Sequence, residues 1–288
     1  MMRLFKNNRY LFLIFLAIFT VLIWRQDTSA GTGLLKVAFL DIGQGDSIYI
    51  QAPNGRQVLI DGGRDQKVLS KLSDVMPYGD RTLDIVIATH PDADHIGGLP
   101  YILRDYGVSL VMEPGVQSES DVYKELEKSI EEEKAEHVFA RRGMVIHLDE
   151  EHGVDLEILF PDRDTTGWET NEASIVAKLV YGKTSFLLTG DAPRSTELYL
   201  HKLNVKELDV DVLKLGHHGS RTSTSPTFIE DTTPNYAIIS AGLNNDYGHP
   251  HKEVLDTLAY YKVPYLATYE KGTIVFESDG KELKLKQN

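Results

Sequence analysis

The chain has 288 residues, of which 42% are hydrophobic, enough for the core of one large domain or two small ones. Its 43 acidic and 30 basic residues give a formal charge of -13, which works against binding nucleic acid through bulk electrostatics alone. Cysteine is absent, so disulfides, thiolate zinc sites and cysteine nucleophiles are excluded.

Residues 1–33 are expected to form a separate segment. Arg3, Lys6 and Arg9 precede an apolar run over residues 10–24, and small residues suited to signal-peptidase cleavage follow at 28–30. This pattern is typical of a signal peptide or a membrane anchor, and both remain open. The basic flank predicts that everything after about residue 30 faces outward, so the protein is secreted or tethered to the membrane. Residues 1–30 carry a net charge of +3, which leaves -16 on the remainder.

From residue 34 onward, short apolar runs alternate with amphipathic segments. In the first half we expect strands at residues 34–40, 47–53, 57–61 and 83–89, and helices at 65–75, 98–106 and 119–136. In the second half we expect strands at 154–160, 174–182, 184–190, 208–216, 236–242, 265–269, 272–278 and 281–286, with helices at 193–203, between the strands at 208–216 and 236–242, and at 252–261. Two β-rich halves that each end in helices indicate two packed sheets with helices outside.

The most informative segment is residues 90–95, which read His-Pro-Asp-Ala-Asp-His. They lie between a buried strand and a helix, so His90, Asp92, Asp94 and His95 are placed on a loop at the carboxyl end of a strand. Loops of this kind carry the chemistry of α/β folds, because their side chains converge at the rim of a rigid sheet. Two imidazoles and two carboxylates within one turn predict a metal site.

Three later loops at strand exits carry further candidate ligands. Asp191 follows an apolar strand end, where a buried carboxylate is costly unless it is paired or metal-bound. His217 and His218 follow the strand at 208–216, and His249 follows the strand at 236–242. Five of the ten histidines therefore lie at strand exits, as expected if these loops meet at one site.

Six motifs occur in an order that is known from one protein family: FLDIGQGDS at 39–47, LIDGG at 59–63, THPDADHIGG at 89–98, LLTGD at 187–191, KLGHHGS at 214–220 and YGHP at 247–250. On these motifs the sequence resembles the metallo-β-lactamase superfamily and, within it, the hydrolase domain of the ComEC DNA-uptake (competence) proteins. The resemblance implies an α+β fold, a four-layer αββα sandwich, with a two-metal centre at one edge. Residues 34–288 would form this hydrolase domain.

The sequence departs from the superfamily pattern at two places. Asp92 stands where the motif HxHxDH has its second histidine, and Asn-Glu-Ala-Ser at 171–174 stands where a third-motif histidine belongs. The resemblance then implies that the first ion is held by His90, Asp92 and Asp191, and the second by Asp94, His95, Asp191 and His249. Carboxylate in place of imidazole favours harder ions, so manganese or magnesium is as plausible as zinc in the first position, which need not be filled at rest.

Two further aspartates are expected beside the ligands. Asp61 ends a strand before two glycines, and it either accepts a hydrogen bond from a ligand histidine or serves as a turn acid. Asp41 follows the first strand in a glycine-containing turn that brings backbone amides near the site. Both would support the metal ligands without binding an ion themselves.

Two divalent ions that share a carboxylate would lower the pKa of a bound water from about 15.7 toward 7 and supply hydroxide at neutral pH. The family resemblance implies that Asp94 accepts or orients the proton of this water. His217 and His218 are expected to stabilise charge or to protonate the leaving group. The donors that follow them suit a phosphate of the substrate, namely Ser220, Arg221 and Thr222.

The leading interpretation is therefore an exported or membrane-tethered metal-dependent hydrolase, a phosphodiesterase or nuclease. The charge of -16 on the exported part opposes the binding of duplex nucleic acid. Two alternatives stay open: a hydrolase of a small ester, lactone or lactam, and a non-catalytic binding module with an incomplete metal site. The sequence indicates no protein partner.

Overall fold

A computed structural model describes residues 33–286 of the chain. The predicted signal or anchor segment, residues 1–33, lies outside the described residues except for its last position. Within the described part, no helix has the length and apolar character needed to cross a membrane.

The first sheet has eight strands in the order β15-β14-β1-β2-β3-β4-β5-β6. These strands are β1 Leu35–Phe39, β2 Ile48–Gln51, β3 Gln57–Ile60, β4 Thr82–Ile87, β5 Gly107–Glu113, β6 Glu136–Phe139, β14 Ile274–Ser278 and β15 Leu283–Lys286. The pairs from β3 to β6 are parallel, whereas β1 pairs antiparallel with both β2 and β14. Parallel strands end at the same edge, so the loops after β3, β4 and β5 lie together.

The second sheet has seven strands in the order β13-β12-β11-β10-β9-β8-β7. These strands are β7 Val145–Asp149, β8 Val154–Phe160, β9 Val176–Tyr181, β10 Thr184–Leu188, β11 Val212–Lys214, β12 Tyr236–Ile239 and β13 Tyr265–Ala267. The strands from β10 to β13 are parallel neighbours. The loops after β10, β11 and β12 therefore also meet at one edge of their sheet.

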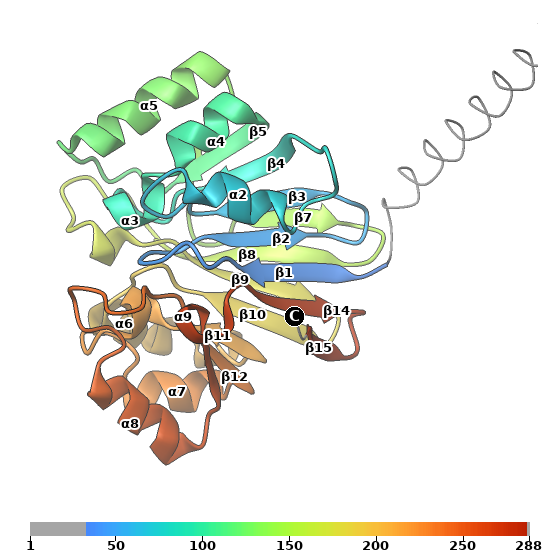
Figure 1. Cartoon of the computed structure of the whole chain (residues 1–288). Helices are drawn as coiled ribbons and strands as arrows, with labels where there is room; N and C mark the ends of the chain where they lie inside the picture. Colours follow the sequence, from blue (N-terminus) through green and yellow to red (C-terminus); the bar gives the residue numbers. More distant parts are fainter. Residues whose placement is uncertain (1–32, 287–288) are drawn as a thin grey trace, which may run out of the picture.

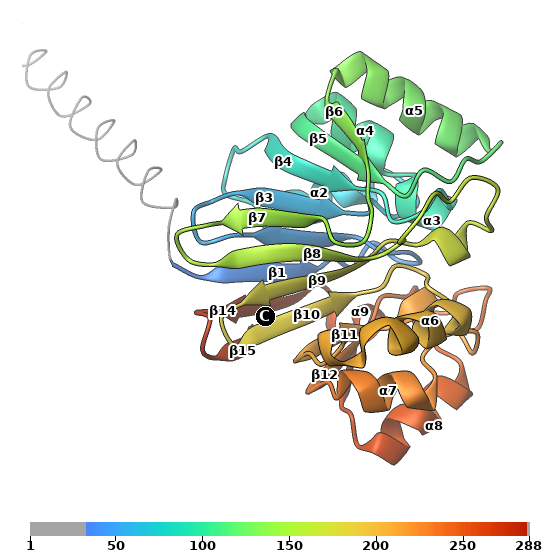
Figure 2. The same ribbon diagram turned by 180° about the vertical axis from the view of Figure 1, so that it is seen from behind.

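The helices cover the outer faces of the two sheets, which gives four layers (Figures 1 and 2). On the first sheet lie α2 Lys67–Ser73, α3 Ala93–Ile96, α4 Leu99–Asp105 and α5 Asp121–Glu133. On the second lie α6 Arg194–Asn204, α7 Pro226–Thr232, α8 Lys252–Tyr261 and α9 Thr268–Lys271, and short 3-10 turns occur at η1 Asn171–Ala173, η2 Val205–Glu207 and η3 Gly216–Gly219. The structure has the αββα layering that the sequence predicts.

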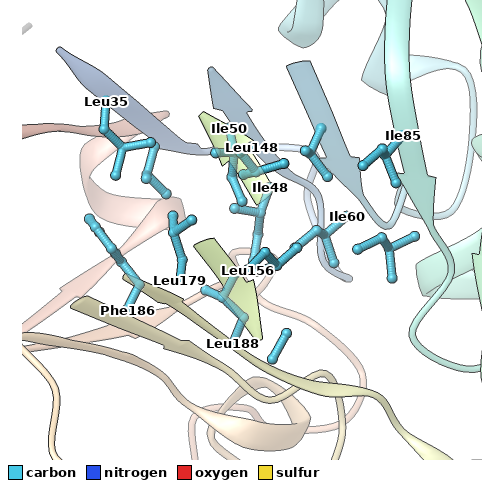
Figure 3. Close-up of a cluster of buried hydrophobic side chains, with 14 of the residues drawn as sticks. Leu35, Ile48, Ile50, Ile60, Ile85, Leu148, Leu156, Leu179, Phe186 and Leu188 are labelled. Carbon is cyan, nitrogen blue, oxygen red and sulfur yellow. The ribbon is translucent and has the colours of Figure 1, made fainter. Parts of the chain in front are cut away.

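The central core lies between the two sheets (Figure 3). Ile48 and Ile50 of β2 point into this core, whereas Tyr49 packs on the opposite face under the helices. Leu156 of β8 and Leu179 of β9 supply the facing side from the second sheet. Because side chains alternate along a strand and both faces are covered, these strands read as nearly continuous apolar runs.

Three strands occupy stretches for which the sequence analysis predicted none: β5, β6 and β7. β6 has the sequence Glu-His-Val-Phe, is largely exposed and pairs with β5 at the edge of its sheet. Its backbone hydrogen bonds, not an apolar pattern, make it a strand. The strand predicted at 265–269 is also shorter, since β13 ends at Ala267 and α9 begins at Thr268.

Candidate metal centre

The loops after β4, β10, β11 and β12 bring their histidines and aspartates together at one edge of the sandwich. The ring centroids of His90 and His95 lie 4.1 Å apart, those of His95 and His218 5.1 Å, and those of His218 and His249 6.1 Å. The carboxylate of Asp191 lies among these rings and is almost completely buried. Residues distant in sequence thus form one cluster of imidazoles and carboxylates.

One part of this cluster is tightly packed: Asp46, His95, Asp191 and His218 each have a ligand atom within 4.8 Å of the others, and Asp94 lies next to His218. Nε2 of His218 lies 3.3 Å from Nε2 of His95, 3.3 Å from Oδ2 of Asp94 and 3.5 Å from Oδ2 of Asp191. Nε2 of His95 is 3.2 Å from Oδ1 of Asp191. Four ligand atoms bound at about 2.1 Å around a tetrahedral ion are about 3.4 Å apart, so these distances suit one cation.

A wider group lies on the other side of Asp191. Nε2 of His90 is 3.7 Å from Oδ2 of Asp92 and 3.9 Å from Oδ2 of Asp191. Nε2 of His217 is 3.8 Å from the same oxygen of Asp191. The side chains of Asp92 and His217 are 40% and 27% exposed, so this group is more open to solvent. Asp191 belongs to both groups.

Unpaired polar atoms support the fit of a divalent cation. Nε2 of His90, Oδ1 of Asp191 and Nδ1 of His249 are buried without a hydrogen-bond partner among the described residues. Leaving a buried polar group unsatisfied costs about 1–3 kcal/mol, and more for a charged group. A cation would satisfy the first two atoms, and the mixture of imidazole and carboxylate donors suits zinc or manganese.

Hydrogen bonds behind the cluster orient two of its rings. Oδ2 of Asp61 lies 2.8 Å from Nδ1 of His95, while Oδ1 accepts the backbone N–H of Thr89 at 2.8 Å. Nδ1 of His218 lies 2.9 Å from the carbonyl oxygen of Ser240. When either ring is neutral and donates through Nδ1, its Nε2 directs a lone pair at the cluster.

A buried ion pair that the sequence analysis did not identify lies beneath His218. Nζ of Lys214 is 2.7 Å from Oδ2 of Asp46, and both side chains are buried. Oδ1 of Asp46 is 3.4 Å from Nδ1 of His218. The sequence feature that could have revealed this ion pair is the lysine inside the apolar run of β11, because a buried ammonium group requires a charged partner.

Electrostatics in the cluster favour positive charge. Burial opposes protonation of His218, but Asp191, Asp46 and Asp94 outweigh it and raise the pKa of the ring to about 9. Burial likewise opposes the charged form of His95, whose pKa nevertheless lies well above its usual value because of Asp191 and Asp61. The protons on His218 and His95 therefore occupy ring nitrogens for which a metal cation would compete.

Two other rings of the cluster remain neutral. Burial and the neighbouring His95 lower the pKa of His90 to about 4. Burial, with His218 and His217 beside it, lowers the pKa of His249 to about 4. Neutral imidazole is the form that binds a metal.

The remaining residues singled out from the sequence make contacts of their own. Thr222 Oγ1 is 3.2 Å from Nδ1 of His217 and donates to Oγ of Ser220 at 3.0 Å. The guanidinium of Arg221 is on an exposed residue whose backbone N–H donates to Nδ1 of His251 at 3.2 Å. The ring of His249 stands 5.4 Å from that of His217, centroid to centroid. Oδ1 of Asp41 lies 3.7 Å from Nζ of Lys67, and its side chain is 29% exposed.

Backbone geometry also shapes the centre. His217 and His218 have φ of 48° and 55°, a left-handed conformation that costs about 1–2 kcal/mol for each non-glycine residue. These angles turn two consecutive rings toward Asp191. Gly45 has φ of 117°, and a Cβ there would lie 1.9 Å from the carbonyl oxygen of Asp94. Glycine thus allows the turn after β1 to pack directly on the loop that carries the ligands.

The model of one protein family, described as the metallo-beta-lactamase superfamily, matches residues 40–242. The chain belongs to the metallo-beta-lactamase superfamily. Its fold and its buried aspartate–histidine cluster support a metal-dependent hydrolase at the level of the superfamily.

Characterised relatives include competence proteins, as the motifs predict. The chain is 36% identical over 261 residues to ComE operon protein 3 of Bacillus subtilis, covering 84% of this chain and 33% of that protein. It is 30% identical over 244 residues to Competence protein ComA of Neisseria gonorrhoeae, covering 83% of this chain and 32% of that protein. The chain thus spans about a third of the length of these relatives.

A solved structure shares the architecture. The metallo-beta-lactamase fold protein YhfI from Bacillus subtilis superposes with a TM-score of 0.56 at 12% identity, covering 85% of this chain and all of that one. At this identity the likeness shows the fold alone. The superfamily fold is therefore supported by sequence and by structure independently.

Proposed function

We propose that this protein is a metal-dependent phosphodiesterase that cleaves nucleic acid strands. The observation that carries the proposal is the position of Asp191, whose carboxylate is shared by two groups of donors at distances of 3.2 to 3.9 Å. Two ions held in this way, when bound, would supply Lewis acidity to a phosphoryl oxygen and acidify water. Similarity to competence proteins adds a reason to place nucleic acid first among phosphodiesters.

The protein's own residues have distinct tasks in this scheme. Burial opposes ionisation of Asp94, but the rings of His218 and His95 hold its pKa below the usual value. Asp94 therefore stays ionised, and Oδ2 accepts a hydrogen bond from the attacking water and orients it. Nδ1 of His217 faces Thr222, so this ring is held in place at the solvent-exposed side of the cluster.

Recognition of the phosphate falls to the segment after β11. Arg221 is exposed, and the hydroxyl of Thr222, the next residue in the chain, lies 3.2 Å from Nδ1 of His217. A guanidinium and a hydroxyl next to bound cations suit a phosphodiester better than a neutral amide. The overall charge of -13 opposes nonspecific binding of duplex, so binding is concentrated at the centre.

The test is metal analysis of the full chain followed by hydrolysis assays with manganese, magnesium and zinc. We expect hydrolysis of bis-p-nitrophenyl phosphate and of linear DNA only with added metal, and loss of both in Asp191→Asn. Activity undiminished by a chelator would contradict the mechanism. Turnover of a β-lactam or lactone tenfold above that of the phosphodiesters would replace the proposed substrate class.

We also propose that residues after about 30 act outside the cytoplasm, either released or tethered by the N-terminal segment. The support is the basic flank and the apolar run over residues 10–24. A fusion of alkaline phosphatase after residue 33 is expected to be active, because that reporter requires export. An inactive but stable fusion would contradict an outward location.

A further inference from the structure

A pocket of about 260 Å³ lies between the loop after β8 and α6, and the proposed function assigns it no role. Its walls come from the loop between β8 and β9 and from α6, with Phe160, Arg163, Trp168, Glu172, Ser195 and Tyr199 among its residues. Figures 1 and 2 both show this loop between α3 and α6. We call it the aromatic pocket.

Three aromatic rings give the pocket flat apolar walls. The centroids of Phe160 and Trp168 are 6.0 Å apart, and those of Phe160 and Tyr199 6.1 Å. The guanidinium carbon of Arg163 lies 5.4 Å from the centroid of Tyr199. Trp168 and Tyr199 are only partly buried, so their rings remain accessible at the pocket. Such surfaces stack on planar ligands.

The polar edge of the pocket combines a paired arginine with the carboxylate of Glu172. Arg163 is paired with Asp162 at 2.8 Å and donates to the hydroxyl oxygen of Tyr199 at 2.6 Å. On the other side, Oγ of Ser195 donates to Oε1 of Glu172 at 3.3 Å. Hydroxyl, guanidinium and carboxylate groups around flat walls match a neutral planar ring with donors and acceptors at its rim. A free phosphate would be repelled by the carboxylate of Glu172, and the charge of Arg163 is already neutralised by Asp162.

The loop that lines the aromatic pocket also contacts residues of the metal centre and of its ligand loops. Oγ of Ser174 accepts the backbone N–H of Asp191 at 3.3 Å, and the N–H of Ile175 donates to the carbonyl of Thr89 at 2.9 Å. The side chain of Thr170 hydrogen-bonds Asp92. Glu172 therefore sits in η1 between two contacts with the ligand loops. A strand whose phosphodiester lies at the centre would therefore run next to the loop that lines this pocket.

We propose that the aromatic pocket binds the nucleobase next to the scissile phosphate of a single-stranded substrate, an inference that rests on the proposed function. The volume is just below the roughly 300–1,000 Å³ of sites for drug-sized ligands, which suits a single base. A base can enter only when it is free of its partner and its stack, which favours single strands over duplex.

The first experiment reads out the pocket without catalysis. The chain has two tryptophans, so Trp24→Phe leaves Trp168 as the only one in the full chain. In chelator, single-stranded oligothymidylate is expected to quench Trp168 and to bind at least about fivefold more tightly than a matched abasic strand, the lower end of base–aromatic stacking. If the protein binds the two strands equally tightly, or binds neither, the proposal is overturned. Equal quenching by duplex overturns the preference for single strands.

The second experiment measures KM and kcat with metal present. Trp168→Ala is expected to raise KM for the intact strand about 5- to 100-fold and to leave KM for the abasic strand unchanged, while Trp168→Phe restores much of the difference. Tyr78→Ala is the matched control, since Tyr78 is 97% exposed and lies outside the pocket. Equal losses on both strands would show a merely structural role for Trp168 and overturn the proposal.

The two readouts separate the inference from the proposed function. Base-dependent quenching of Trp168 in a protein that cuts no strand with any metal would refute the phosphodiesterase and keep the nucleobase site. Metal-dependent cleavage of intact and abasic strands with the same KM, without quenching of Trp168, would keep the phosphodiesterase and refute the nucleobase site.

Discussion

The Nε2 atoms of His95 and His218 lie 3.3 Å apart inside the protein, and their rings are stacked with centroids 5.1 Å apart. Two ring nitrogens at this distance repel each other through their lone pairs unless a proton or a cation lies between them. Both rings are buried and face Asp191. A proton or a cation between these two histidines would therefore stabilise the site.

The first prediction concerns His218, which the sequence analysis assigned to catalysis. Because Nε2 lies within 3.5 Å of Asp94, His95 and Asp191, we expect His218→Ala to weaken metal binding at least about tenfold. Metal analysis and calorimetric titration of the purified protein measure this change. His147→Ala is a matched control on an exposed histidine. Full metal content with reduced turnover would return His218 to a role at the substrate.

The second prediction concerns Asp61, whose carboxylate accepts hydrogen bonds from Nδ1 of His95 and from both the N–H and the hydroxyl of Thr89. Asparagine keeps the shape but has a single acceptor oxygen. We expect Asp61→Asn to reduce metal affinity about 10- to 100-fold and to lower stability by about 1–3 kcal/mol. The exposed Asp65→Asn serves as control in titration and urea unfolding. Unchanged metal affinity would show that His95 needs no such support.

The third prediction concerns the buried pair of Asp46 and Lys214. Removing one partner leaves an uncompensated buried charge, so Asp46→Asn and Lys214→Met are each expected to cost about 3–5 kcal/mol of unfolding free energy. The double variant should recover much of this loss, because no isolated charge remains. Urea unfolding of the four proteins forms a double-mutant cycle. Additive losses in the double variant would mean that the two residues do not stabilise each other.

The fourth prediction concerns Glu113 at the end of β5. It is buried against Glu127 and Tyr123 of α5 and His137 of β6, and burial, then Glu127, raises its pKa from 4.5 to about 8. The folded state thus keeps a proton that the unfolded chain has lost above pH 4.5. The contribution of Glu113 to the free energy of unfolding is fully present below pH 4.5. It falls as the pH rises toward 8, by about 1.4 kcal/mol for each pH unit between the two pKa values.

Glu113→Gln removes this ionisation, so the variant should gain stability relative to the natural protein as pH rises from 5 to 8. Urea unfolding at both values measures the difference, and the fully exposed Glu119→Gln is the control. A stability difference that does not change with pH would show that Glu113 is ionised in the folded state.

The sequence was sufficient for features that depend on neighbours along the chain. The His-Pro-Asp-Ala-Asp-His segment places four donors in one turn after an apolar run, and Asp191, His217 and His249 follow other apolar runs. Strand exits meet at one edge of a parallel sheet, so the order of residues alone predicts that these loops converge. The two-sheet layering followed from the same alternation of strands and helices.

The tertiary structure decided which atoms come within reach of a common ion. His218, the pair of Asp46 and Lys214, and the aromatic pocket all depend on how segments from different strands pack against each other. The left-handed backbone at His217 and His218 aims both rings, and residue spacing gives no sign of such angles. β6 likewise arises from hydrogen bonds to a neighbouring strand instead of an apolar pattern. Periodicity reports which face of an element is buried, but distances across two packed sheets are set by register and backbone torsion, which are properties of the folded chain.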